Sequence, residues 1–120
     1  MKTNGSGRTL VVDDEEVMRD ILATLLSTEG YAVDLAENGA RALELMQEGE
    51  YSAVLLDLML PDIDGLQVLA EISRMADAHA TIVLTAFATI ERAVRATKLG
   101  AYDFITKPFK NDEILLALRN

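Results

Sequence analysis

The stretch VLLDLMLPDIDG, residues 54–65, joins an apolar run to a group of turn-forming residues, with Asp57 at the junction. The three branched apolar residues before Asp57 are typical of a strand that is buried on both faces. A strand does not continue through Pro61 and the acidic, glycine-containing residues that follow it. The sequence therefore predicts a core strand that ends on a carboxylate at the edge of a sheet.

The rest of the chain alternates short apolar runs with helical patterns. Strands are predicted at residues 9–12, 32–36, 53–57, 81–84 and 102–105. Helices are predicted at residues 15–28, 38–47, 66–75, 89–99 and 112–119. Five strands that are each followed by a helix imply a parallel sheet, covered on both faces and joined by right-handed crossovers. We therefore expect an α/β fold.

The predicted helices have recognisable ends. Asn38 is expected to cap the second helix, and Gly30, Gly49 and Gly100 lie just past the ends of the first, second and fourth helices. In the first helix, apolar residues recur at helical spacing and are expected to form one apolar stripe. The residues of this stripe are Val17, Met18, Ile21, Leu22, Leu25 and Leu26.

The composition is that of one ordinary globular domain. The 120 residues are 50% hydrophobic and 26% charged, which is enough to bury a sizeable core. A net charge of −9 argues against direct binding of this domain to nucleic acid or to an anionic membrane. The absence of cysteine excludes disulfides and thiolate metal sites. With no bilayer-spanning stretch and no signal peptide, we expect a cytoplasmic protein.

The two ends of the sequence suggest how the chain is organised. Residues 1–7 are polar and are expected to form a flexible segment ahead of a domain at residues 8–120. The last predicted helix has about two turns, which is short for a helix that covers an outer strand. We therefore expect the domain to come from a longer protein with an output domain after it, although a small complete protein would look the same.

The residues that follow the predicted strands carry most of the chemistry. In an open α/β sheet, ligands bind beyond the carboxyl ends of the strands. Asp13 and Asp14 follow the first strand, Asp57 ends the third, Thr85 follows the fourth and Lys107 follows the fifth. We therefore expect carboxylates, a hydroxyl and an ammonium group to converge at one edge of the sheet.

This set of groups favours phosphoryl chemistry with a metal ion. Crowded carboxylates repel one another unless a cation joins them. Oxygen ligands without cysteine or paired histidines suit a hard cation such as Mg²⁺, which shares its coordination sphere with waters and phosphate. An ionised aspartate beside that metal can attack a phosphoryl group and form an aspartyl phosphate. Lys107 would offset the charge on the phosphoryl oxygens, and Thr85 would hydrogen-bond to them.

Four motifs resemble the receiver domain of the response regulators of bacterial two-component signalling: LVVDDEEVMRDIL, VLLDLMLPDIDG, IVLTAFA and YDFITKPF. They occur in the order and at the spacing of that family over residues 8–119. The resemblance implies a flavodoxin-like (βα)5 three-layer sandwich with strand order 2-1-3-4-5. Within the family, GAYDFITKPF is similar to the nitrogen-regulation subfamily, whose members activate a specialised sigma factor.

The resemblance also implies a role for each residue of the site. Asp57 would be the phosphoacceptor, Lys107 the phosphate-binding cation, Thr85 the switch hydroxyl and Phe104 the aromatic residue that moves between outward and inward positions. The peptide bond between Lys107 and Pro108 would be cis. The ligands of Mg²⁺ would be Asp13, Asp14, Asp57 and the backbone carbonyl of Met59.

Partners follow from the same resemblance. A histidine kinase would donate the phosphoryl group, and phosphorylation would promote a homodimer through the face formed by the fourth helix, fifth strand and fifth helix. The domain would then act on an output domain and control transcription. It would be a signalling switch that catalyses only its own phosphotransfer and dephosphorylation, not a metabolic enzyme.

Each assignment has a purely structural alternative. Asp14 would cap the first helix, where acidic residues also favour the helix dipole. Lys107 would be an ordinary solvated lysine. Thr85 would be a simple strand-end residue, and Phe104 would belong to the core.

Two other classes of function also use this type of fold. A Mg²⁺-dependent phosphohydrolase with an aspartate nucleophile commonly needs a second acid two residues later, and that position is Met59. The alternative class is an interaction module with a degenerate site, or a flavodoxin-like cofactor carrier. The complete set of acids argues against an interaction module with a degenerate site. No strand-end loop is rich enough in Ser, Thr and Gly to hold the phosphate of a flavin, which argues against a cofactor carrier.

Overall fold

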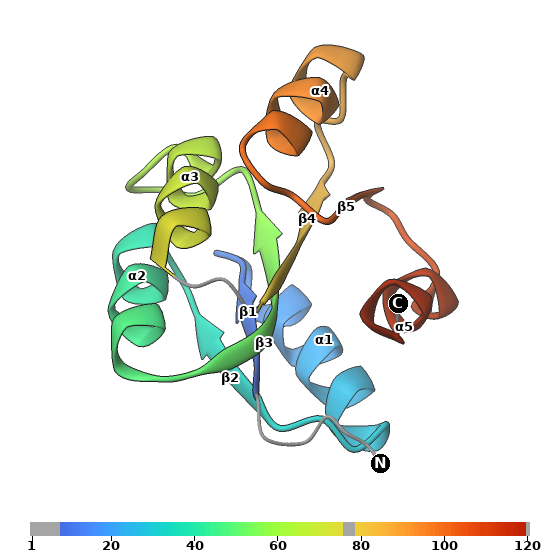
Figure 1. The fold of residues 1–120 in the computed structure, drawn as a ribbon. Helices are drawn as coiled ribbons and strands as arrows, with labels where there is room; N and C mark the ends of the chain where they lie inside the picture. The colour runs from blue at the N-terminus through green and yellow to red at the C-terminus, as the bar shows by residue number, and fades with distance from the viewer. Residues whose placement is uncertain (1–7, 76–78, 120) are drawn as a thin grey trace.

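A computed structural model describes residues 8–75 and 79–119, so the expectation for residues 1–7 lies outside the described residues. One parallel sheet runs through the molecule in the order β2-β1-β3-β4-β5 (Figure 1). The strands are β1 (Arg8–Val12), β2 (Val33–Ala36), β3 (Tyr51–Asp57), β4 (Ala80–Thr85) and β5 (Asp103–Thr106). The predicted α/β class, the number of strands and their order are confirmed.

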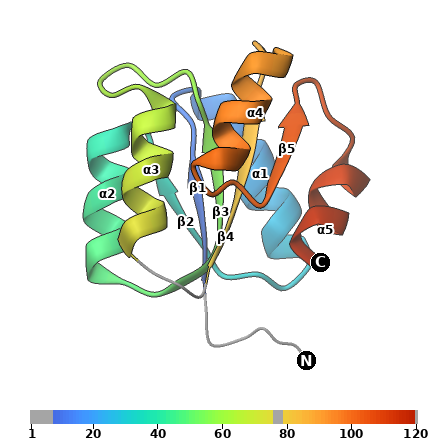
Figure 2. The same cartoon turned by 45° about the horizontal axis from the view of Figure 1, so that its top comes forward.

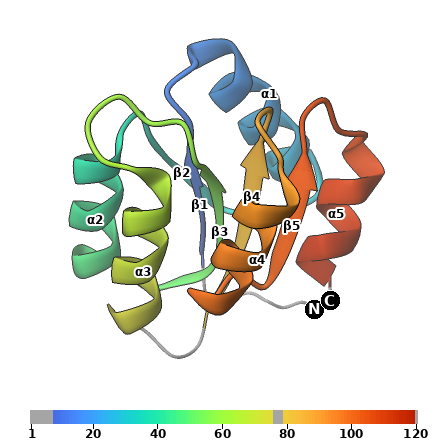
Figure 3. The same cartoon turned by 90° about the horizontal axis from the view of Figure 1, so that it is seen from above.

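In the part of the chain that the structure describes, five helices cover the two faces of this sheet. They are α1 (Glu16–Thr28), α2 (Gly39–Glu48), α3 (Gly65–Met75), α4 (Ile90–Lys98) and α5 (Asn111–Arg119). Figures 2 and 3 show α1 and α5 on one face and α2, α3 and α4 on the other. The sheet therefore separates two packed layers of apolar side chains, as expected when crossovers place helices on both faces.

The strand residues alternate between these two layers. On the α2–α3–α4 face, Val54 and Leu56 of β3 pack in one cluster with Leu69 and Ile72 of α3. On the other face, Leu55 packs in a second cluster of buried residues from α1 and α5. Because β3 lies in the middle of the sheet, its side chains are buried on both sides, as its apolar sequence predicts.

The apolar stripe of α1 is only partly buried. Leu22 and Leu26 are buried, but the side chains of Val17 and Ile21 are 70% and 47% exposed. The predicted stripe is wider than the strip of α1 that contacts the sheet, so its outer apolar residues face the solvent. Periodicity identified the helix, and the packing of α1 on the sheet decides which residues of the stripe are buried.

The predicted helix ends agree with the structure. The side chain of Asn38 accepts a hydrogen bond from the backbone N–H of Arg41 at the start of α2. Gly30 and Gly100 follow α1 and α4 with φ of 93° and 111°, the left-handed region in which side chains other than glycine are strained.

Two close contacts shape the β3–α3 loop that follows Asp57. A Cβ on Gly65 would lie 2.3 Å from Leu58 Cα, so only glycine allows α3 to start against the end of β3. The carboxylate of Asp62 accepts hydrogen bonds from the backbone N–H groups of Gly39 and Ala40, at 2.8 and 2.9 Å. The loop is thus fixed both to its own strand and to the N-terminus of α2.

Among residues 8–75 and 79–119, none of the helices has the length and apolar character needed to cross a membrane.

Candidate functional site

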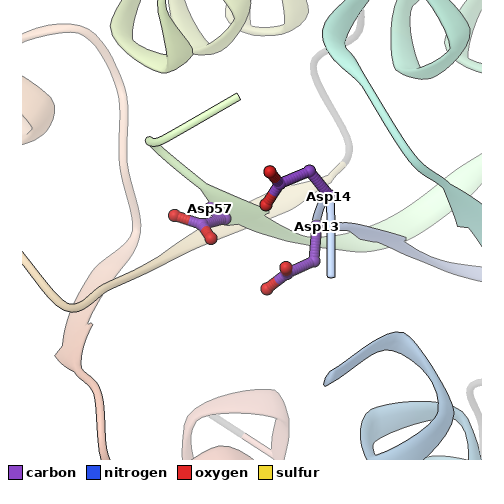
Figure 4. A group of neighbouring side chains, drawn as sticks. All are labelled: Asp13, Asp14 and Asp57. Atoms are coloured by element: carbon purple, nitrogen blue, oxygen red, sulfur yellow. The ribbon is translucent and has the colours of Figure 1, made fainter. Parts of the chain in front are cut away.

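The carboxyl ends of β1 and β3 bring three aspartates together. Asp13 and Asp14 follow β1, Asp57 ends β3, and one carboxylate oxygen of each lies within 4.8 Å of those of the other two. Figure 4 shows the side chains of Asp13 and Asp14 next to each other, with Asp57 on the neighbouring strand beside them. Asp13 and Asp57 are buried, and Asp14 is exposed. The predicted convergence of acids is therefore present.

Lys107 joins two of these acids from the far end of the sequence. Its Nζ donates to Asp13 Oδ2 at 2.7 Å and to Asp57 Oδ2 at 2.9 Å. The side chain of Lys107 is only 10% exposed, so the alternative of a solvated lysine is wrong. The backbone N–H of Lys107 donates to the carbonyl of Thr85, and the bond to Pro108 is cis, as the resemblance implied.

Burial and charge act against each other in this group. Burial raises the pKa of Asp57 above its ordinary value, and hydrogen bonds from the Met59 N–H and from Lys107 reverse only part of that effect. Burial alone would lower the pKa of Lys107, but its hydrogen bonds to Asp13 and Asp57 outweigh burial and raise it. The lysine therefore stays charged, while the carboxylate of Asp57 is held in surroundings that disfavour its negative charge.

Thr85 and Phe104 lie on the neighbouring strands. Thr85 is fully buried at the end of β4, and its hydroxyl accepts a hydrogen bond from the backbone N–H of Phe87 at 3.2 Å. Phe104 lies beside Val83 in the sheet register and is half-buried against the α2–α3–α4 cluster. Their positions match the sequence expectation, and their roles in switching stay predictions.

The structure also decides between two readings of Asp14. Glu15 occupies the N-cap position of α1 without a side-chain cap, and the side chain of Asp13 accepts from the Glu15 N–H at 2.9 Å. Among the described residues, Asp14 has no hydrogen-bond or ion-pair partner. The alternative that Asp14 caps α1 is therefore wrong, and its exposed carboxylate is available to a ligand.

Two residues near the site were not expected from the sequence. Asp62 anchors the β3–α3 loop, and Arg92 of α4 contacts the side chain of Met59. Met59 itself is 45% exposed, and its N–H donates to Asp57 Oδ1 at 3.0 Å. No local motif marks Asp62 or Arg92, because Asp62 contacts the start of α2 and Arg92 contacts Met59, and both partners are distant in the sequence.

The donor set fits a divalent metal ion. Three carboxylates supply oxygen ligands without sulfur or nitrogen, which suits a hard cation, and the negative charge of the cluster exceeds what Lys107 alone balances. The predicted fourth ligand, the carbonyl of Met59, belongs to a residue whose N–H is already bound to Asp57.

Replacing Asp14 tests the metal assignment without disturbing the fold. In Asp14→Ala, we expect the affinity for Mg²⁺ to fall at least about tenfold, because one oxygen ligand is lost. The free energy of unfolding in EDTA should stay within about 0.5 kcal/mol of the original, because the side chain is exposed and unpartnered. Calorimetric Mg²⁺ titration and urea unfolding measure the two quantities, with Asp20→Ala on α1 as the control. A large loss of metal-free stability would contradict this assignment.

The fold and the site define an α/β domain that gathers acids and one buried lysine at the carboxyl edge of its sheet. The family model of the response regulator receiver domain matches residues 9–119. The chain belongs to this family, as its motifs predicted.

Curated relatives agree with this assignment. An NtrX-like response regulator of Rickettsia bellii is 42% identical over 112 residues, covering 92% of this chain and 23% of that protein. YkoG, a transcriptional regulatory protein of Bacillus subtilis, is 41% identical over 113 residues, covering 94% of this chain and 50% of that protein. The chain thus spans about a quarter to a half of the length of these relatives.

Three solved structures share the fold at 36% sequence identity. A response regulator of Burkholderia pseudomallei with a phosphorylated aspartate, calcium and citrate has a TM-score of 0.90, covering 94% of this chain and 66% of that one. TrrA of Thermotoga maritima, in complex with Mg²⁺ and beryllofluoride, has a TM-score of 0.85 and covers 94% and 96%. The beryllofluoride-activated NtrC4 receiver domain dimer has a TM-score of 0.88 and covers 93% of each chain.

Proposed function

We propose that this domain is a phosphorylation switch of a cytoplasmic two-component system and that it accepts its phosphoryl group from a histidine kinase on Asp57. The observation that carries the proposal is the position of the Asp57 carboxylate. It lies at the end of the central strand, 2.9 Å from the buried ammonium of Lys107 and beside two further acids. A carboxylate held between a cation and a metal-binding cluster is suited to become an aspartyl phosphate.

In the proposed reaction, a carboxylate oxygen of Asp57 attacks the phosphorus of the phosphohistidine. The P–N bond breaks, its electron pair returns to the imidazole, and an acyl phosphate forms on Asp57. Lys107 neutralises negative charge on the phosphoryl oxygens from the position it already occupies. Asp13, Asp14, Asp57 and the Met59 carbonyl would hold Mg²⁺, which neutralises phosphoryl charge when bound.

The similar structures support both parts of this chemistry. The Burkholderia pseudomallei regulator carries a phosphorylated aspartate and a calcium ion, and TrrA binds Mg²⁺ with beryllofluoride. This chain offers an aspartate and an acid cluster of matching chemistry at the edge of the same fold.

The residues of the same site favour a long-lived phosphoryl group on Asp57 over repeated hydrolysis of a phosphorylated substrate. A phosphohydrolase of this type needs an acid two residues after the nucleophile, and Met59 has no proton to give. We therefore propose a signalling switch that catalyses only its own phosphotransfer and slow dephosphorylation. The rival reading, an aspartate-dependent phosphohydrolase, predicts many turnovers per chain.

We further propose how the phosphoryl group changes the surface. Its oxygens would accept a hydrogen bond from the Thr85 hydroxyl, and Phe104 would then move further inward. The surface that changes would be the α4–β5–α5 face, which exposes large apolar side chains. These are Ile90, Val94, Tyr102 and Leu116. Such a patch on a small domain favours association, and the NtrC4 receiver dimer supports a homodimer of the activated form.

The wider role of the protein extends the same proposal. The relatives are two to four times longer than the aligned region, and one is a transcriptional regulatory protein. We propose that the domain controls transcription through an output domain and that it is related to the nitrogen-regulation proteins. With a net charge of −9, direct contact with DNA is assigned to that output domain.

One experiment tests the switch against the phosphohydrolase. The protein is incubated with Mg²⁺ and an excess of acetyl phosphate. We expect intact-mass spectra with one alkali-labile phosphoryl group per chain, and light scattering with a larger dimer fraction than before addition. Phosphate release should follow the slow decay of that group. Rapid release of many phosphates per chain, with no phosphorylated protein detected, would favour the phosphohydrolase.

A further inference from the structure

Arg92 of α4 contacts both loops that border the phosphoacceptor. Its Nη1 lies 3.3 Å from the carbonyl oxygen of Phe87 in the β4–α4 loop and 3.7 Å from Met59 Sδ in the β3–α3 loop. The N–H of Met59 binds the Asp57 carboxylate, and the N–H of Phe87 binds the Thr85 hydroxyl. Arg92 is therefore one residue removed from each of the two groups that a phosphoryl group on Asp57 would engage.

These contacts are weak for a guanidinium group. Arginine carries five N–H donors in a planar fork that matches carboxylate or phosphate oxygens in pairs. In this structure the guanidinium of Arg92 donates one long hydrogen bond to the Phe87 carbonyl and contacts the thioether of Met59, which is a weak acceptor. Within residues 8–75 and 79–119, Arg92 takes part in no ion pair. A half-buried cation with such poor partners would exchange them readily for an anion.

Arg92 also borders a cavity next to the residue that follows Asp57. Arg92 lines a cavity of about 190 Å³ between the start of α3 and the start of α4, with Leu58 and Met59 among its other lining residues. Two acids, Asp64 and Glu91, also line the cavity, and neither is paired with Arg92. Asp64 Oδ1 accepts from the backbone N–H of Leu66. A phosphoryl group brings about two negative charges and three acceptor oxygens, which neither acid matches.

Lys107 and a Mg²⁺ held by the acids would both lie on the Asp13 side of Asp57, so further donors to the phosphoryl oxygens would come from the β4–α4 side. Lys107 Nζ is shared between Asp57 and Asp13, so it offers only part of its hydrogen-bonding capacity to a new anion. Thr85 would supply one donor. The guanidinium of Arg92 would supply two more from the α4 side of the site, whereas the contacts of Lys107 are to Asp13 and Asp57.

We propose that Arg92 is a second cationic ligand of the phosphoryl group, an inference that rests on the proposed phosphorylation of Asp57. When the phosphoryl group forms, the guanidinium leaves the Phe87 carbonyl and the Met59 sulfur and binds phosphoryl oxygens. Arg92 also belongs to the first turn of α4, where its N–H is capped by Thr89. The new contact therefore pulls directly on the start of α4, whose only buried side chain is Ala96.

The test follows the side chain of Arg92 by NMR in the wild-type protein with Mg²⁺, before and after addition of beryllofluoride. We expect the Nε–Hε signal of Arg92 to shift and to exchange more slowly with water, while that of Arg95 stays unchanged. Calorimetric titration should give an affinity for beryllofluoride about tenfold weaker in Arg92→Gln and less than twofold weaker in Arg95→Gln. Arg95 lines the same cavity and carries the same charge, so it controls for long-range electrostatics.

Each outcome decides the inference. The variant Arg92→Lys keeps the positive charge but lacks the planar set of guanidinium donors. Its affinity for beryllofluoride should therefore lie between those of the wild type and Arg92→Gln. An unchanged Arg92 signal, together with equal affinities of Arg92→Gln and Arg95→Gln, would overturn the role of Arg92 and leave the proposed function intact. If the wild-type protein failed to bind beryllofluoride with Mg²⁺, both the proposed function and this inference would be wrong.

Discussion

Asp57→Asn is expected to take up no phosphoryl group from acetyl phosphate in the presence of Mg²⁺. The amide of asparagine keeps the size and most of the hydrogen-bonding shape of the carboxylate, but its nitrogen is not a nucleophile at neutral pH. The loss should therefore be complete, whereas loss of a metal ligand or of Lys107 would only slow the reaction. Intact-mass spectrometry measures the phosphorylated fraction.

The matched control for this variant is Asp20→Asn, which makes the same chemical change at an exposed position of α1. Its phosphorylated fraction should equal that of the wild type. The far-ultraviolet circular dichroism of Asp57→Asn should also match the wild type, because removal of a buried charge beside Asp13 relieves repulsion. An Asp57→Asn protein that is phosphorylated as fully as the control would place the phosphoacceptor elsewhere.

The sequence predicted those parts of the site that depend on local order along a strand. Asp13, Asp14, Asp57 and Thr85 each lie at the end of an apolar strand, and the ends of parallel strands share one edge. The topology alone therefore brings together residues as distant as Asp13 and Lys107. The strand order was implied by the family resemblance and is confirmed.

The sequence was less informative about which face of an element is covered. Val17 and Ile21 follow the same spacing as Leu22 and Leu26, and only the packing of α1 on the sheet decides that they are exposed. Likewise Asp13 and Asp14 are chemically identical neighbours. Burial of Asp13 against Lys107 follows from the alternation of side chains at the end of β1.

The contacts of Asp62 and Arg92 could not be predicted from the sequence pattern. Each joins a loop to a different helix, so each depends on the distance between elements that the pattern does not give. Asp62 reads as one more turn-forming residue after Pro61. Arg92 reads as part of the charged surface of α4.

Lys107→Met is expected to lower the free energy of unfolding by about 3–5 kcal/mol at pH 7 in EDTA. The substitution removes a cation whose side chain is only 10% exposed, while the side chains of its partners Asp13 and Asp57 are 1% and 7% exposed. Two buried like charges then remain without a positive partner, and methionine fills the space of the lysine stem without replacing its charge. Urea unfolding of the variant and the wild type measures the difference.

The loss should depend on pH in a defined direction. Burial already raises the pKa of Asp57, and the variant lacks the hydrogen bond from Lys107 that partly opposes this, so its pKa in the folded state rises further. A carboxyl group whose pKa is higher in the folded state than in the unfolded state binds its proton more tightly when the protein is folded. Its contribution to stability is therefore fully present below the unfolded-state pKa of about 3.9, and it is lost as the pH rises through the folded-state pKa. The difference between variant and wild type should therefore be smallest near pH 4 and should increase towards neutral pH.

Two further measurements separate this electrostatic cause from a packing defect. Adding Asp13→Asn to Lys107→Met removes one of the two like charges and should recover part of the lost stability at pH 7. Mg²⁺ should stabilise Lys107→Met more than it stabilises the wild type, because it replaces the missing cation and binds only the folded site. Lys110→Met, at an exposed lysine, should behave as the wild type throughout. A loss that is the same at pH 4 and pH 7 and unaffected by Asp13→Asn would show that Lys107 contributes packing and not charge.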